Sequence, residues 1–154
     1  MSSKYKFHDP DGCYFVTFAV VDWVDLFTRN VYKEILLESW RYCQQHKGLL
    51  IHAYVIMTNH VHMIISRKSD TLLEAIMRDM KKFTSSKLLE AIKKEPESRR
   101  EWMLRLFRQA GKITATTRYF SCARQPSDRM QLCTISAQDL RQLAKIHPWH
   151  IYLL

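Results

Sequence analysis

The chain has 154 residues, of which 47% are hydrophobic, and this is enough for one domain with a substantial core. No apolar stretch approaches the ~20 residues of a membrane-spanning helix and the first nine residues are polar, so we expect neither a membrane nor a secreted protein. The net charge is +9, with thirteen Lys/Arg against seven Asp/Glu in residues 67–112, and such a local excess favours a nucleic-acid partner, although solvated helix faces explain it equally well.

The first half of the chain predicts three strands and a helix. Residues 13–21 are rich in aromatic and β-branched side chains and indicate a buried strand. Apolar residues then recur every three or four positions over 30–46, which predicts an amphipathic helix that stops at Gly48. Residues 49–57 and 61–66 predict two strands, and their short link makes them an antiparallel hairpin.

The second half begins with two predicted helices. Apolar residues lie at helical spacing over 72–92 and again over 98–110, where Gly111 is the expected stop. We interpret Trp102 and Phe107 as core side chains of the second of these helices rather than as base-stacking platforms. The order strand, helix, strand, strand, helix is most of a ferredoxin-like split βαβ arrangement. We therefore expect an α+β fold, an antiparallel sheet with flanking helices.

The pattern changes after residue 112. Residues 113–132 show no sustained period, and only 136–146 look helical. We therefore expect one domain over 1–112, followed by an atypical tail over 113–154 that does not extend the fold and is partly disordered. The four cysteines are widely spaced and contain no Cys-x-x-Cys pair, so we expect reduced thiols in the cytoplasm.

The candidate site is the sequence Asn59-His60-Val61-His62, at the start of the third predicted strand. A strand places alternate side chains on one face, so both imidazoles can reach the same metal ion. Two imidazoles leave open positions on a divalent cation, which can polarise a phosphate. A His-x-His pair on a half-exposed strand is also an ordinary surface feature. His52 has no nearby partner in the sequence, and we interpret it as structural.

A family resemblance adds to this pattern. Residues 53–65 (AYVIMTNHVHMII), preceded by YFVTF at 14–18 and followed by KKFTS at 81–85, resemble the REP-associated tyrosine transposases. These belong to the single-tyrosine, His-hydrophobic-His group of insertion-sequence-type transposases. The resemblance covers roughly residues 14–112, and its apolar-Met-x-Asn-His-Val-His segment is a specific signal.

The resemblance implies a bacterial protein, usually dimeric, that binds a hairpin in single-stranded DNA and cleaves and joins it, in the cytoplasm and on the nucleoid when bound. His60 and His62 would hold Mg²⁺ or Mn²⁺, and a tyrosine on a later helix would attack a DNA phosphate to leave a 5′-phosphotyrosine. Basic side chains of the two later helices would contact phosphates, namely Lys81, Lys82, Lys87, Arg99, Arg100, Arg105 and Arg108.

The chain departs from the family at the nucleophile. Relatives carry it in a helix that reads Tyr-Ile/Leu-His-x-Asn-Pro, whereas the nearest string here, KIHPW at 145–149, has lysine in its place. Tyr119 and Tyr152 are the only tyrosines after the His pair. Tyr119 is the candidate that remains, in an aperiodic stretch that supplies a fixed attack geometry poorly, while Tyr152 lies two residues from the last residue.

A frameshift would explain this departure. Residues 112–117 (KITATT) can be encoded as AAA ATA ACA GCA ACA ACN, and one extra A converts them into Lys-Asn-Asn-Ser-Asn-Asn, a polar linker typical of these relatives. On this hypothesis the tail is an out-of-frame read-through that replaces the catalytic helix. The chain would then keep a metal site and a DNA surface but lack strand transfer.

Three functions stay open on the sequence alone. The first is a metal-dependent DNA-nicking transposase domain, active or inactivated. The second is a non-catalytic DNA-binding module or a repressor derived from a transposase, which the missing tyrosine favours. The third is a metal-binding or purely structural α+β domain in which the two histidines are incidental. Gln138, Asp139 and His147 are possible third metal ligands, but the sequence does not single out any of them.

Overall fold

The structure, a computed structural model, describes residues 7, 9, 11–113 and 133–134. Four strands, three α-helices and one short 3-10 helix follow one another along this part of the chain. In order they are β1 (Tyr14–Ala19), η1 (Val21–Trp23), α1 (Asn30–His46), β2 (Leu49–Ile56), β3 (His60–Arg67), α2 (Leu73–Lys94), α3 (Arg100–Ile113) and β4 (Cys133–Thr134).

The strands form one antiparallel sheet in the order β2-β3-β1-β4. β3 lies between β1 and β2 and is antiparallel to both. The strands β1 and β2 therefore run in the same direction without touching, and α1 connects them, which is the split βαβ arrangement. The predicted ferredoxin-like α+β fold with flanking helices is confirmed.

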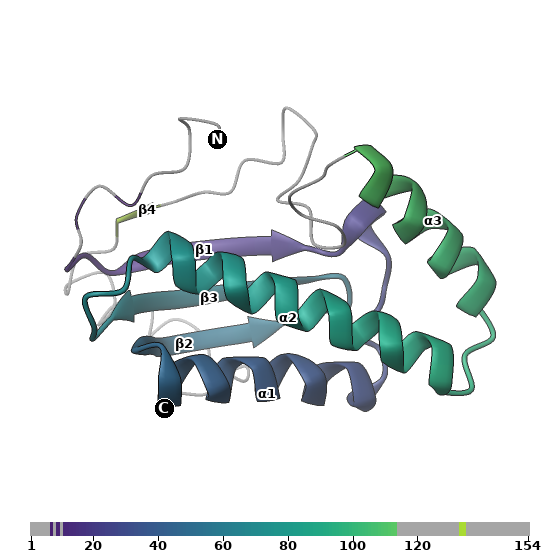
Figure 1. The fold of residues 1–154 in the computed structure, drawn as a ribbon, viewed down its shortest axis with the longest axis horizontal. Coiled ribbons are helices and arrows are strands. Elements are labelled where there is room, and N and C mark those ends of the chain that lie inside the picture. The colour runs from purple at the N-terminus through teal and green to yellow at the C-terminus, as the bar shows by residue number, and fades with distance from the viewer. Residues whose placement is uncertain (1–6, 8, 10, 114–132, 135–154) are drawn as a thin grey trace.

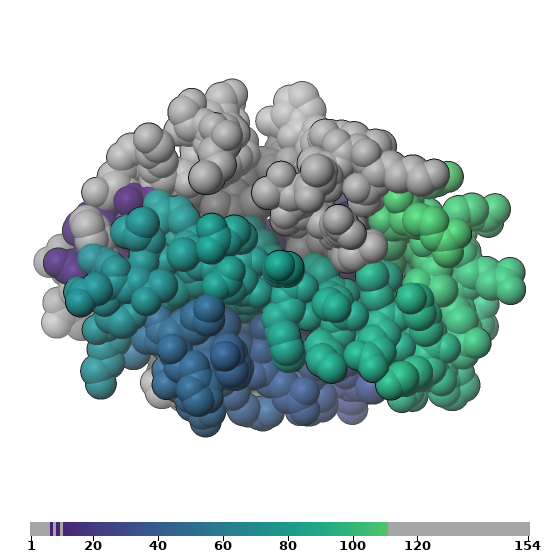
Figure 2. Space-filling model, in the orientation of Figure 1, coloured from purple at the N-terminus to yellow at the C-terminus, as the bar shows by residue number. Residues whose placement is uncertain are grey.

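The helices α1 and α2 cover one face of the sheet (Figure 1). Figure 2 shows their outer surfaces, which hide the sheet from this side. The core lies beneath them: Val61, Met63 and Ile65 alternate along β3 and are at most 1% exposed. Large side chains of both helices pack against these residues, chiefly Tyr32, Leu36 and Trp40 of α1 and Ile76, Met80 and Ile92 of α2. Each stabilises the fold by roughly 1.5–3 kcal/mol through the apolar surface that it buries.

Of the two glycines predicted to end helices, one does so and the other does not. Gly48 ends α1 as predicted: its φ of +71° is left-handed, and a Cβ there would collide with Ser69. Gly111, by contrast, lies inside α3, which continues to Ile113. A glycine in a helix interior costs only about 1 kcal/mol, so packing of the helix outweighs it.

We expect the tail not to extend the fold, but two of its residues do. Cys133 and Thr134 pair antiparallel with Phe15 and Tyr14, and so add the edge strand β4 next to β1. A two-residue strand is too short to leave a periodic pattern in the sequence. The proposed boundary at residue 112 stays a prediction, because the remaining tail residues lie outside the described ranges.

The two aromatic residues of α3 differ in their burial. Phe107 is 3% exposed and belongs to the core together with Met103, one turn earlier. Trp102 is 47% exposed, so its interpretation as a core residue is wrong. It is one position away from Met103, and a step of one residue rotates a side chain by about 100° around a helix, out of the buried stripe.

Two expectations about the environment of the chain can be compared with the structure. Cys13 and Cys43 are free thiols. Within the described ranges, no helix is both long and apolar enough to cross a membrane.

Candidate metal centre and nucleic-acid interface

His60 and His62 lie side by side on the face of the sheet opposite α1 and α2. They alternate along β3 with the core residues Val61 and Met63, which point toward the helices. Both imidazoles are half-buried, and their Nε2 atoms are 3.1 Å apart. The predicted convergence of the two rings is therefore present in the folded chain.

In each ring the outer nitrogen, Nδ1, is the one that does not face the other histidine, and it has a partner of its own. His60 Nδ1 lies 2.6 Å from Asn59 Oδ1, an oxygen that can only accept, so Nδ1 carries the proton and the Nε2 lone pair faces His62 Nε2, which lies within hydrogen-bond distance at 3.1 Å. His62 Nδ1 lies 2.7 Å from Thr17 Oγ1, which stands opposite it on β1. Such partners set the orientation of the ring and the tautomer of metal-binding histidines.

Burial lowers the pKa of His60 below its ordinary value. Burial also lowers the pKa of His62, and the neighbouring His60 lowers it further because two positive charges would repel. Both shifts therefore favour the neutral form of the rings. A neutral imidazole is the form that binds a metal ion.

The residues fit a divalent cation. Two ligands about 2.1 Å from one ion and about 90–110° apart are about 3.0–3.4 Å from each other, and the Nε2 atoms have this spacing. Within the described ranges, no group of three His, Cys, Asp or Glu side chains could complete a site. The possible third ligands lie outside these ranges, namely Gln138, Asp139 and His147.

Two aromatic rings that sequence reasoning missed flank the His pair. Phe15 of β1 stacks on His62, with 5.4 Å between the ring centroids and 18° between the planes. Trp23 of η1 meets His60 edge-on, at 5.4 Å and 68°. Phe15 could have been found from strand alternation with Thr17, whereas nothing in the sequence around Trp23 indicates its contact.

The loop over residues 20–27 is held against the turn that carries His60. Its first amide, Val20 N, donates to Asn59 O at 2.8 Å, and its last, Phe27 N, donates to Thr58 O at 2.8 Å. The Arg99 side chain donates to Asp25 O at 3.2 Å, from the segment between α2 and α3. These contacts fix Trp23 relative to His60. Figure 1 shows η1 and α3 at the end of the sheet where β3 starts.

Three of the seven basic side chains predicted to bind DNA make contacts within the fold. Arg100 donates to the carbonyls of Ile92 and Glu95 and so caps the end of α2. Arg99 donates to Glu97 Oε1 at 3.1 Å, besides its contact with Asp25. Lys87 pairs with the exposed Glu90 at 3.3 Å.

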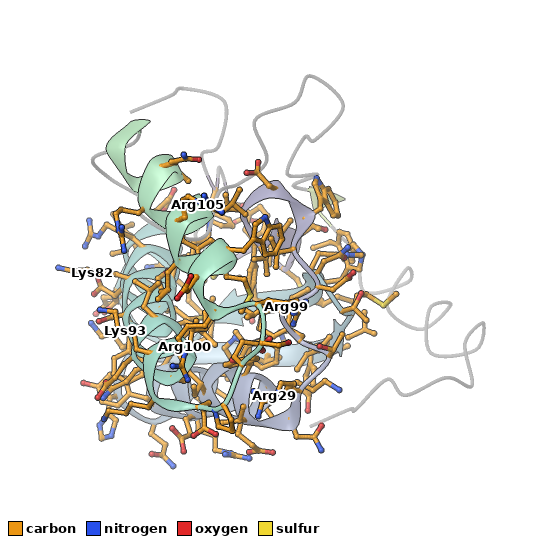
Figure 3. All side chains as sticks on the ribbon, turned by 90° about the vertical axis from the view of Figure 1, so that its right-hand side faces the viewer. Arg29, Lys82, Lys93, Arg99, Arg100 and Arg105 are labelled. Carbon is orange, nitrogen blue, oxygen red and sulfur yellow. The ribbon has the colours of Figure 1, made fainter. Side chains whose placement is uncertain are left out.

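The other four basic side chains lie on α2 and α3. Lys82, Arg105 and Arg108 are exposed and Lys81 is half-exposed. Figure 3 shows Lys82 and Lys93 projecting outward on the side away from Arg99 and Arg29. The lysines of α2 lie across the sheet from the His pair, while α3 lies at the end of the sheet near His60 (Figure 1). The structure thus does not gather the predicted DNA-binding residues into one cluster around the candidate metal centre.

The described tyrosines lie away from the His pair. Tyr14 and Tyr54 are on the helix-covered side of the sheet, in or against the core, and Tyr32 and Tyr42 belong to α1. The candidate nucleophile Tyr119, like Tyr152, lies outside the described residues.

His52 lies at a bulge in β2, and its Nε2 is 2.7 Å from Ser66 Oγ on β3. This contact agrees with the structural interpretation of His52. The partner is 14 residues away along the chain, so local sequence could not indicate it.

The fold and the His-hydrophobic-His pair on the face opposite α1 and α2 define the class of α+β transposase proteins that the sequence resembles. The profile of the family described as "Transposase IS200 like" matches residues 14–117. The chain therefore belongs to the IS200-like transposase family. The comparison with curated proteins found no match.

Two solved structures share the fold. One is a REP-associated tyrosine transposase bound to a REP hairpin, at a TM-score of 0.55 and 16% identity, with 93% of this chain and 68% of that chain covered. The other is a candidate transposase from Deinococcus radiodurans R1, at a TM-score of 0.51 and 12% identity, with 94% of each chain covered.

Proposed function

We propose that this transposase-family chain binds hairpin single-stranded DNA and that His60 and His62 hold a divalent ion, Mg²⁺ or Mn²⁺, against a DNA phosphate. The observation that carries the proposal is the convergence of the two Nε2 atoms at 3.1 Å, with both Nδ1 atoms engaged by Asn59 and Thr17. The solved relative with this fold that is bound to a REP hairpin supports DNA as the ligand.

The chain's own residues would divide the work as follows. His60 and His62 present neutral nitrogens to the cation, and Asn59 and Thr17 keep the rings oriented. The bound cation would polarise the phosphate and stabilise the departing 3′ oxygen. The basic residues of α3, Arg105 and Arg108, would attract the DNA backbone. Assembly as a homodimer is part of this proposal, and light scattering of the purified chain tests it.

Cleavage also requires a nucleophile. A tyrosine hydroxyl would attack the phosphorus, its proton would leave to solvent or a base, and the bond to the 3′ oxygen would break to leave a 5′-phosphotyrosine. The candidate is Tyr119. The four described tyrosines lie away from the His pair, so none of them is a candidate. The alternative is the second function, a DNA-binding module that does not cut.

A denaturing gel separates the two functions. The full chain is incubated with labelled hairpin DNA from the flanks of its own gene, with Mn²⁺ or with EDTA. Active nicking predicts a covalent adduct that disappears with EDTA and in His60→Ala, and peptide mapping with Tyr119→Phe and Tyr152→Phe then identifies the nucleophile. Hairpin binding without an adduct would establish the non-catalytic module. A chain that neither binds nor forms an adduct would contradict the proposal.

A further inference from the structure

Trp23 is a large, exposed ring next to the candidate metal centre. Its side chain is 44% exposed although one edge contacts the His60 ring. Aromatic side chains normally bury most of their surface in the core, as Trp40 does at 2% exposure. Trp23 therefore leaves much of its surface free to contact another planar group.

The backbone that presents this ring is unusual. Asp22 and Trp23 are consecutive residues with φ of 51° and 55°, a left-handed conformation that is unfavourable for residues other than glycine and is rare for bulky ones. Such conformations persist only where the surrounding structure holds them, and they cluster at functional sites. Here Trp23 N donates to Val20 O at 3.0 Å, and both ends of the loop are bonded to Thr58 and Asn59.

The contact with Trp23 is not needed to orient His60, because Asn59 already orients that ring. On the other side of the pair Phe15 stacks on His62 and is half-buried, which leaves Trp23 as the more exposed wall of the site. In a single strand, each phosphate is flanked by two nucleosides. A base next to the phosphate at the His pair is therefore within reach of a ring beside His60.

We propose that Trp23 is a base-stacking residue, on which the unpaired base next to the phosphate at His60 and His62 rests, so that Trp23 positions the nucleotide at the metal centre. The inference rests on the proposed function. Stacking on an aromatic ring accepts every base, so Trp23 would add affinity for unpaired DNA with only a modest preference among bases.

The test compares two DNA probes of equal length. Both carry the same hairpin stem, and the single-stranded tail consists either of deoxythymidine or of abasic tetrahydrofuran nucleotides. The full chain should bind the first probe more tightly. Trp23→Ala should lose about tenfold in affinity for the base-containing tail but little for the abasic tail, and Trp23→Phe should recover most of the loss. Tyr42→Ala, which removes an exposed ring on α1, should leave the ratio between the probes unchanged.

Binding of Mn²⁺ without DNA provides the readout that a merely structural role would move. Trp23→Ala should keep the Mn²⁺ affinity of the unchanged chain, whereas His60→Ala should lose it. Equal losses on both tails, or a loss of Mn²⁺ affinity in Trp23→Ala, would overturn the inference, because Trp23 would then only support His60. An unchanged affinity for both probes would overturn it as well. If the unchanged chain binds neither probe, the proposed function fails and not the inference alone.

Discussion

At the residue scale, the outer hydrogen bonds of the two imidazoles decide what the His pair can do. Asn59 and Thr17 direct both Nε2 atoms toward one point, 3.1 Å apart. Strand alternation makes the pair predictable from the sequence. Asn59 directly precedes His60, so its contact is local. Thr17 is 45 residues from His62, so only the register of β1 against β3 reveals its role.

Thr17→Val tests this outer contact. Valine has the same shape as threonine but cannot bond to His62 Nδ1, so we expect Mn²⁺ affinity to fall about 10–100-fold with the fold retained. Calorimetric titration measures the affinity, and Thr17→Ser, which keeps the hydroxyl, should restore most of it. An unchanged affinity in Thr17→Val would show that Thr17 does not orient His62.

The lowered pKa values of His60 and His62 predict a pH dependence of stability in the absence of metal. Because the pKa of each ring is below its ordinary 6.5, the unfolded chain takes up protons at a higher pH than the folded chain. The two neutral rings contribute fully to the free energy of unfolding above pH 6.5. This contribution is lost as the pH falls from 6.5 through the lower pKa values that the rings have in the folded chain. Urea unfolding at pH 7 and pH 5 measures this loss, and it should be smaller in the double variant His60→Asn/His62→Asn. An equal loss in both chains would contradict the assignment.

At the element scale, Glu97 joins the α2–α3 connection to α1. Its side chain is 4% exposed, accepts from Arg99 Nε at 3.1 Å and from Tyr32 Oη at 3.3 Å, and lies 3.6 Å from Arg29. Burial acts to raise the pKa of Glu97, but its hydrogen bonds from Arg99 and Tyr32 and the charge of Arg99 outweigh burial and hold the pKa below its ordinary value. The same connection carries the Arg99 contact to Asp25, next to the loop of Trp23.

Glu97→Ala should therefore lower the free energy of unfolding by about 1–3 kcal/mol, because it leaves the partners of a buried carboxylate unsatisfied. Urea denaturation measures the change. The matched control is Glu90→Ala, which removes an exposed carboxylate paired with Lys87 and Lys94 and should have little effect. Equal effects of the two substitutions would refute the role of Glu97.

Elements were easier to predict than contacts between them. The strands and helices follow from local periodicity, and Gly48 from its place after a helix. The sequence does not indicate that Arg99 is held within the fold, because its partner Asp25 is 74 residues away. Trp102 was misplaced by a single helical position, which periodicity over a short helix does not resolve.

At the scale of the whole molecule, the predicted DNA-binding side chains that the structure describes and the candidate metal centre occupy different places. The His pair is on the face of the sheet opposite α1 and α2, Lys81 and Lys82 are on α2 across the sheet, and Arg105 and Arg108 are on α3. A DNA that reaches both the metal centre and the basic residues would have to pass along the end of the sheet where η1 and α3 lie (Figure 1).

This arrangement predicts which cations matter for DNA affinity. Arg105→Ala should reduce the slope of log affinity against log salt by about one if Arg105 contacts one phosphate, and Lys33→Ala on α1 should leave it unchanged. Fluorescence anisotropy of a labelled hairpin at several salt concentrations gives the slope. The same slope in Arg105→Ala as in the unchanged chain would exclude α3 from the interface at that position.

The central claim is that His60 and His62 together bind the metal ion used on DNA. Electron spin echo spectroscopy of Mn²⁺ in the complex of the full chain with hairpin DNA tests it most directly, because nitrogen nuclei bonded to the ion modulate the echo. The account predicts modulation from two imidazole nitrogens, reduced to one in His60→Ala or His62→Ala and absent when both are replaced. Mn²⁺ that shows only phosphate and water around it in the unchanged chain would contradict the account.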